Sequence, residues 1–156
     1  MLLIIGFLFM VLFIFIATGS LSGMGLGQMI DLPSALIVII SLIFFLILSK
    51  SGSVIGRYFK TSFTKEHTYT GSELEGLLAA IRNTIKFTLG TGGVGFLFGI
   101  IAMLMNLADR QMIGPNLAVS LFTVLYSVTI SFFVFYPTQA WAENKLASLK
   151  GDAEER

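Results

Sequence analysis

Long apolar stretches alternate with short polar segments along most of this chain of 156 residues. Four stretches are long enough to cross a bilayer as α-helices, which rise about 1.5 Å per residue. They cover residues 1–19, 32–50, 87–107 and 114–137, and no Asp, Glu, Lys, Arg or His lies deep within them. The pattern predicts one all-α membrane domain over residues 1–156, a polytopic protein with four transmembrane helices.

The fourth stretch carries a stripe of polar side chains: Asn116, Ser120, Thr123, Ser127 and Ser131. Steps of three and four residues keep this stripe on one face of an α-helix. Two interpretations stay open at this point. The hydroxyl groups either bond back to carbonyls of their own helix and pack against a neighbouring helix, or face a pore or a partner protein.

The segment between the second and third spans, residues 51–86, is charged. In its first part, the spacing of apolar residues predicts a short amphipathic segment that lies at the membrane surface. These residues are Val54, Ile55, Tyr58, Phe59 and Phe63. A second apolar series at helical spacing comprises Leu74, Leu77, Leu78, Ile81 and Ile85. No helix breaker follows it, so we expect the third helix to begin near Glu73, extend into the cytoplasm and end near Leu107. Ser72 and Glu75 match a capping box at its start.

Composition and charge placement support a membrane protein and predict its orientation. Charged residues make up 12% of the chain, against about 25% in soluble domains. Apart from Arg110, every Lys and Arg lies in residues 50–86 or in the tail, residues 138–156. The positive-inside rule therefore predicts that both termini, residues 51–86 and this tail are cytoplasmic. Residues 1–19 lack the basic start of a secretory signal and are expected to remain as a span, although the small residues that follow are compatible with cleavage.

Few residues in this chain can perform chemistry. There is no Cys, and the single His67 lies without clustered carboxylates, so we expect no metal centre, no cofactor and no enzymatic activity. The net charge of +1 gives no indication of nucleic-acid binding. Because hydroxyl groups do not titrate near neutral pH, any ion path would need a carboxylate from another chain.

The third and fourth stretches carry a recognisable series of residues. It comprises Gly92, Gly95, Gly99, Met103–Leu104, Asn106–Leu107, Gly114–Pro115, Ala118–Val119, Leu121, Thr123, Tyr126 and Pro137. The run Ile30–Asp31–Leu32–Pro33–Ser34 adds a similar opening of the second span. In these residues the chain resembles the MotA/TolQ/ExbB proton-channel family, and most closely its MotA branch. The match is strongest from Gly90 to Pro137.

The resemblance implies a homopentameric ring in the lipid of the bacterial inner (cytoplasmic) membrane. The last two spans would line a pore that holds a dimeric single-span partner of the MotB/TolR/ExbD type, and this partner would bring an ion-carrying Asp. Thr123 would face that Asp, and the ion path would be lined further by Ser120, Ser127 and Asn116. Pro137 would shape the cytoplasmic exit. The implied function is that of a channel subunit in an ion-motive-force-driven, motor-like complex.

Glycines on the third stretch have a structural interpretation as well. Gly95 and Gly99 form a small-xxx-small pair, and with Gly92 they are expected to allow close helix packing.

Three features depart from the family pattern. Leu89 replaces a Pro that opens the third span, and Phe96 replaces a pore Thr. A ring of five Phe96 side chains would form a pore constriction, because hydrophobic constrictions gate by dewetting. Residues 51–86 are also far shorter than the MotA cytoplasmic domain, as in a short member that lacks it. An alternative function is therefore a non-conducting membrane scaffold of the same fold. The sequence does not distinguish protons from sodium ions.

Overall fold

The computed structural model describes Ile16, residues 31–63 and residues 69–154, and it is helical with no strand among these residues. The elements are α2 (Leu32–Leu48), α3 (Ser51–Phe63), α4 (Gly71–Met105), α5 (Arg110–Ile130), the π-helical turn η2 (Ser131–Phe135) and α6 (Tyr136–Glu154). The predicted all-α class is thus confirmed. Except for Ile16, the predicted span 1–19 lies outside the described residues.

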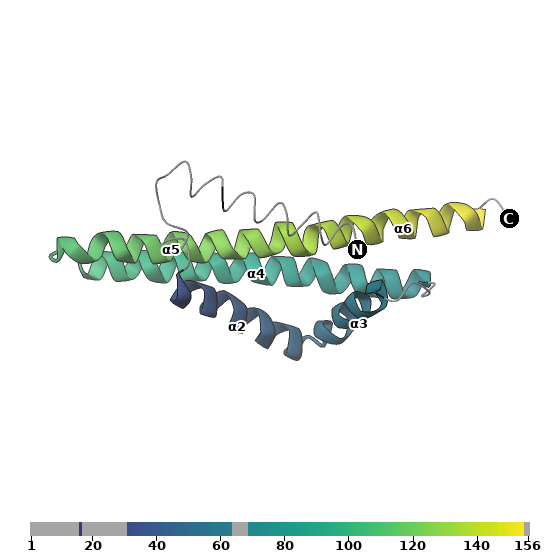
Figure 1. Ribbon diagram of the computed structural model, residues 1–156, viewed down its shortest axis with the longest axis horizontal. Coiled ribbons are helices and arrows are strands. Elements are labelled where there is room, and N and C mark those ends of the chain that lie inside the picture. Colours follow the sequence, from purple (N-terminus) through teal and green to yellow (C-terminus); the bar gives the residue numbers. More distant parts are fainter. Residues whose placement is uncertain (1–15, 17–30, 64–68, 155–156) are drawn as a thin grey trace.

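Two long antiparallel helices form the body of the molecule (Figure 1). One is α4, with 35 residues, and the other runs through α5, η2 and α6 as 43 residues from Arg110 to Asp152. Both are long and apolar enough to cross a membrane. At 1.5 Å per residue α4 is about 52 Å long, so it must extend beyond a hydrocarbon core of about 30 Å. The single long third helix expected from the sequence is confirmed, and its extension into the cytoplasm stays a prediction.

Helices α2 and α3 form a bent pair beside α4 (Figure 1). The Asp31 carboxylate accepts a hydrogen bond from the backbone N–H of Ser34 at 2.9 Å and caps α2, and Pro33 occupies the first turn. After α2 the chain turns at Lys50, whose φ of 55° is left-handed, and α3 leaves at an angle of 100°. Helices α2 and α3 form a third candidate span only if the bent pair is treated as one membrane-crossing segment. The number of four transmembrane helices stays a prediction.

Two helix starts differ from the sequence-based expectation. The carboxylate of Glu73 accepts hydrogen bonds from the N–H and the hydroxyl of Thr70, both at 3.0 Å. The capping pair is therefore Thr70 and Glu73, and the prediction of Ser72 with Glu75 was wrong, because α4 already begins at Gly71. Helix α5 begins at Arg110, where the Asp109 carboxylate accepts from the N–H of Gln111 at 3.0 Å.

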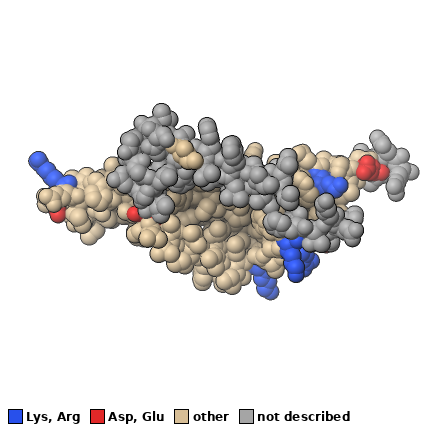
Figure 2. Space-filling view, viewed as in Figure 1, with Lys and Arg blue, Asp and Glu red and all other residues tan. Residues whose placement is uncertain are grey.

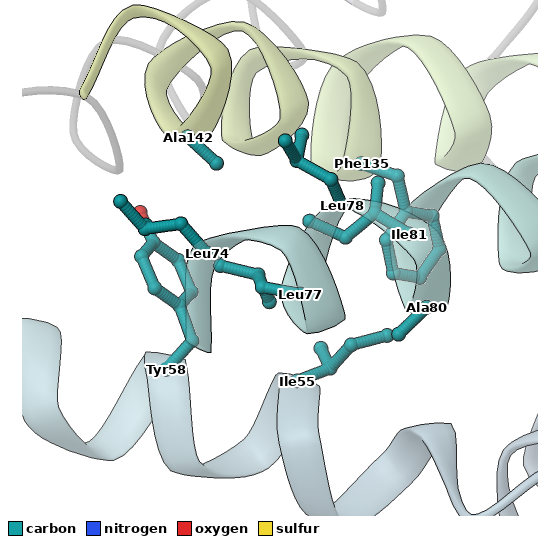
Figure 3. Packing of buried hydrophobic residues seen from close by; sticks show 9 residues of the cluster. All are labelled: Ile55, Tyr58, Leu74, Leu77, Leu78, Ala80, Ile81, Phe135 and Ala142. Carbon is teal, nitrogen blue, oxygen red and sulfur yellow. The ribbon is translucent and has the colours of Figure 1, made fainter. Parts of the chain in front are cut away.

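The apolar core lies around the first half of α4 and not in the middle of the predicted spans. It comprises Ile55, Tyr58, Leu74, Leu77, Leu78, Ala80, Ile81, Phe135 and Ala142 (Figure 3). The predicted apolar stripe of α4 supplies its centre, with Leu74 and Ile81 completely buried. Trp141 of α6 packs on Tyr58 and Tyr69, with ring centroids 5.1 and 5.5 Å apart. This core packs α3 and α6 against the first half of α4.

Charged side chains are concentrated toward the ends of this elongated molecule. In Figure 2 the Lys and Arg side chains lie toward both ends, and the visible described surface between them is mostly tan. Large apolar side chains are exposed on α2, α4 and α5, including Ile47, Phe98 and Leu121. A broad apolar belt of this kind is stable in lipid and not in water, so the chain is a membrane protein.

Candidate functional site

The closest approach of α4 and α5 is a row of glycines facing a row of hydroxyl groups, which we call the glycine–hydroxyl seam. Its facing pairs are Gly92–Ser127, Gly95–Thr123 and Gly99–Ser120. Each row spans seven residues, so the three pairs stay opposite one another in the antiparallel hairpin, with a step of three on one helix facing a step of four on the other. The three hydroxyl-bearing side chains are at most 1% exposed in this structure.

Each hydroxyl of the seam donates to a carbonyl of its own helix. Ser120 Oγ bonds to the carbonyl of Asn116 at 2.8 Å, and Thr123 Oγ1 bonds to that of Val119 at 2.9 Å. Ser127 Oγ donates to the carbonyl of Val124 at 2.9 Å. Within one protomer these residues therefore have the geometry of the first interpretation, back-bonding and helix packing. Their part in an ion path stays a prediction.

Two polar atoms of the predicted stripe have no hydrogen-bond partner among the described residues. They are the side-chain nitrogen Nδ2 of Asn116 and the hydroxyl of Ser131. Ser131 is 1% exposed and opens the π turn η2. A buried polar group without a partner costs about 1–3 kcal/mol. Some polar groups of the stripe thus have hydrogen-bond partners and others have none, and the sequence pattern does not distinguish the two kinds.

The π turn η2 ends at Phe135, two residues before Pro137. Because Pro has no N–H, it leaves one helical hydrogen bond unmade. The N–H of Tyr136 donates to the carbonyl of Ser131, a step of five residues. Pro137 is about 21 Å from Thr123 along the helix axis at 1.5 Å per residue, so the structure does not bring these two residues together. Phe96 and Leu89 are half-buried on α4.

The sequence-based reasoning missed two threonines of α4. Thr84 and Thr88 are buried, and their hydroxyls donate to the carbonyls of Ala80 and Thr84 at 2.8 Å. They precede Gly92 at steps of four residues, on the same face of α4. This continuity of spacing with the glycine row is the signal that could have found them.

A large groove between α2, α4 and α5 was also missed. Its volume is about 1220 Å³, and Gly95, Gly99 and Thr123 of the seam reach its wall. Helix α2 contributes four residues at steps of four: Ile37, Ser41, Phe45 and Ser49. Phe45 stacks on Phe87 of α4 with ring centroids 4.3 Å apart. At the other end of α2, Ser34 Oγ donates to the carbonyl of Val119 at 3.0 Å.

Ion pairs join α4 to α6 outside the predicted spans. Arg82 Nη2 donates to Glu143 Oε1 at 2.6 Å, and Gln139 Nε2 donates to the same oxygen at 3.0 Å. The hydrogen bond from Arg82, with a smaller one from Gln139, holds the pKa of Glu143 below its usual value. Lys150 and Glu75 form a second pair at 3.3 Å. Among the described residues, no group of three His, Cys, Asp or Glu is placed to hold a metal ion.

A hairpin of two long apolar helices with a buried glycine–hydroxyl seam defines a polytopic membrane protein, and comparisons relate it to known proteins. No family model matches the chain. It is 48% identical over 46 residues to the chemotaxis protein PomA of Vibrio alginolyticus, covering 30% of this chain and 18% of PomA. It is 35% identical over 78 residues to motility protein A of Cereibacter sphaeroides, covering 50% and 29% of the two chains.

A third relative is the uncharacterised protein YtxD of Bacillus subtilis strain 168. It is 41% identical over 63 residues, which cover 40% of this chain and 23% of YtxD. The chain therefore spans less than a third of the length of each of these three curated relatives. As distant homologues, motility protein A and PomA support a MotA-like family for this chain.

Proposed function

We propose that this protein is the ring-forming channel subunit of an ion-motive-force-driven, motor-like membrane complex. The observation that carries the proposal is the similarity to motility protein A and PomA, two proteins named for motility and chemotaxis. The hairpin of α4 and α5 supports it, because two apolar antiparallel helices in each copy are a suitable wall for a ring. The chain would be a short MotA-like member in the bacterial inner membrane, with both termini in the cytoplasm.

In this proposal the ion is carried by a carboxylate that this chain does not supply. Residues 87–107 and 114–137 contain no Asp, Glu, Lys, Arg or His, and ion transfer needs a titratable or ligating group in the path. An Asp on a dimeric single-span partner would meet Thr123 at the centre of a homopentamer.

A non-conducting scaffold of the same fold is the second candidate. Phe96 favours it, because an aromatic ring repeated around a pore would exclude water. The variant Phe96→Thr separates the two candidates in an ion-flux assay. If Phe96 constricts a conducting pore, flux rises in this variant; a scaffold without a path gives no flux in either protein.

The test of the leading proposal compares two matched threonines. Thr123→Val removes one hydroxyl and keeps the side-chain shape, so the packing of its methyl group against Gly95 remains. Thr138→Val is the control, because Thr138 is equally a back-bonding threonine, with its hydroxyl 3.0 Å from the carbonyl of Val134, but lies beyond the predicted span. Each variant is expressed in the native host without the wild-type copy, and ion uptake is measured in inverted membrane vesicles.

We expect Thr123→Val to abolish ion uptake and Thr138→Val to leave it unchanged. Native mass spectrometry of the purified complex provides the control for assembly, and both variants are expected to form the same ring as the wild type. Unchanged uptake in Thr123→Val would remove this hydroxyl from the mechanism. A partner that copurifies without any membrane-embedded Asp would contradict the proposal as a whole.

A further inference from the structure

The groove between α2, α4 and α5 has a polar end and a long apolar part. At the polar end lie Ser49 of α2 and Asn83 and Lys86 of α4. Apolar side chains predominate in the remainder, among them Ile37, Phe45, Phe87, Val94 and Phe98, and the hydroxyl-bearing Ser41, Thr91 and Thr123 also line it. The glycines Gly90, Gly95 and Gly99 also line it. A volume of about 1220 Å³ exceeds the 300–1,000 Å³ that is usual for pockets of drug-sized ligands.

The polar end carries an uncompensated positive charge. Lys86 is exposed, and within the part of the chain that the structure describes no carboxylate lies within ion-pair distance of it. The nearby cation Arg82, one turn earlier on α4, is already paired with Glu143. Asn83 adds a side-chain amide that can donate to phosphate oxygens, whereas the hydroxyl of Ser49 already donates to the carbonyl of Phe45 at 2.7 Å. The chemistry of this end therefore complements a phosphate monoanion.

The length of the groove matches one leaflet of a bilayer. From Lys86 to Phe98 the axis of α4 advances about 18 Å at 1.5 Å per residue, against about 15 Å for half of the hydrocarbon core. Lys86 stands at the predicted cytoplasmic boundary of the span that begins at residue 87. A molecule with its phosphate at Lys86 and its hydrocarbon along Gly90 and Val94 would lie at the natural depth of a phospholipid.

We propose that this groove binds one anionic phospholipid of the cytoplasmic leaflet, with its phosphate on Lys86 and Asn83 and an acyl chain along Gly90, Val94 and Phe98. A helix from a second copy is a poorer occupant, because the four predicted spans contain no carboxylate that could pair with Lys86. The inference does not depend on the proposed function; it needs only that the α4–α5 hairpin lies in a membrane.

Two glycines allow a matched steric test. A Cβ added at Gly90 or at Gly93 meets no atom within 4 Å, so a side chain can leave the backbone at either position without a clash at its first carbon. Only Gly90 lines the groove. Gly90→Leu therefore fills the site, and Gly93→Leu is the control. For the charge, Lys86→Gln is compared with Lys145→Gln, whose lysine is exposed on α6 and does not line the groove.

The measurement is native mass spectrometry of the full chain, delipidated in mild detergent and titrated with phosphatidylglycerol or with phosphatidylcholine. We expect one phosphatidylglycerol per protomer at concentrations where phosphatidylcholine does not bind. Lys86→Gln should weaken phosphatidylglycerol binding about fivefold, the effect of roughly 1 kcal/mol for one lysine at an anionic lipid surface. Gly90→Leu should weaken it about tenfold or more, and both control variants should bind as the wild type does.

Three results would overturn the proposal. The first is that the wild type binds phosphatidylglycerol and phosphatidylcholine equally well. The second is that Gly90→Leu and Gly93→Leu bind phosphatidylglycerol equally well, and the third is that Lys86→Gln and Lys145→Gln do so. If Gly90→Leu dissociates the oligomer while the lipid count stays unchanged, a second copy fills the groove and the lipid does not.

Discussion

At the scale of single residues, the distance between α4 and α5 depends on the absence of side chains at three glycines. A Cβ added at Gly99 would lie 2.9 Å from the Cβ and 3.0 Å from the Cα of Ser120. Contacts with a backbone atom cannot be relieved by turning a side chain, so the helices would have to separate. At Gly95 the added Cβ would lie 3.1 Å from the Cβ of Thr123 and would also meet its methyl group.

Gly99→Ala should therefore destabilise the hairpin. We expect a loss of about 1–3 kcal/mol in the free energy of unfolding, which is usual when an extra methyl group enters a well-packed interface. The matched control is Gly93→Ala, where open space and better helix propensity predict a gain of up to about 1 kcal/mol. The free energy of unfolding of both variants is measured in mixed detergent micelles. Equal values would contradict the close packing of α4 and α5 at the glycine–hydroxyl seam.

Ser131→Ala should change the free energy of unfolding in the opposite direction from the same substitution at Ser127, whose hydroxyl has a hydrogen-bond partner. The Ser131 hydroxyl is buried without a partner among the described residues, so its removal should raise the free energy of unfolding by about 1 kcal/mol. Ser127→Ala removes a hydroxyl that bonds to the carbonyl of Val124, and it should lower stability slightly. The same unfolding assay applies. A loss in Ser131→Ala as large as in Ser127→Ala would mean that this hydroxyl has a partner in the protein.

At the scale of elements, the second long helix keeps one face against α4 over its whole length. Its buried positions are Ser120, Thr123, Ser127, Ser131, Phe135, Thr138 and Ala142. Each step of four residues turns an α-helix about 40° past a full turn, so successive steps of four drift around the axis. The π turn η2 has a wider turn and takes up this drift, and Pro137, two residues after it, removes one competing α-helical hydrogen bond.

The docking of α6 on α4 should weaken in acid. Because the pKa of Glu143 is lowered in the folded protein, its contribution to stability is fully present above its usual value of 4.5. It is lost as the pH falls through the lowered pKa. Arg82→Gln should raise the pKa of Glu143 toward its usual value, whereas Lys150→Gln, which affects only the separate pair with Glu75, should not. Carboxyl ¹³C NMR in micelles measures the pKa of Glu143 in both variants. An unchanged pKa in Arg82→Gln would refute the conclusion that Arg82 lowers it.

Much of the helical framework could be predicted from the sequence. The apolar spacing around Leu74 and Ile81 predicted that α4 continues from a polar stem into the apolar stretch, and Pro33 predicted the start of α2. The start of α4 was predicted two residues late, because Thr70 and Ser72 both have a glutamate three residues on and only the fold selects between them. The polar stripe on the fourth span could be identified, but its role could not. Its spacing does not determine whether it packs against a row of glycines on another helix or faces water.

Other features could not be predicted, because they depend on how elements are placed. The amphipathic piece expected at the membrane surface implied a bend after the second span, and α3 is a separate helix there, but neither the angle of 100° nor the left-handed turn at Lys50 could be predicted. The groove exists because α2 is held at Ser34 near Val119 and at Phe45 on Phe87, contacts between residues far apart in the chain. Local sequence patterns do not determine such long-range pairs.

At the scale of the whole molecule, α2 and α3 lie beside the long hairpin (Figure 1), and α2, α4 and α5 all expose large apolar side chains. Phe98 and Leu121 remain exposed in one copy, so lipid or other subunits must cover them. In the proposed function, further copies of the chain and helices of a partner would cover these side chains.

The most direct test of this account is a cryo-EM map of the protein in lipid nanodiscs with its native membrane partners retained. The account predicts a five-fold ring that holds additional helices at its centre, with an Asp of the partner facing Thr123. A monomer, a different symmetry, or a ring with a centre closed by Phe96 and no partner helix would contradict the proposed channel function.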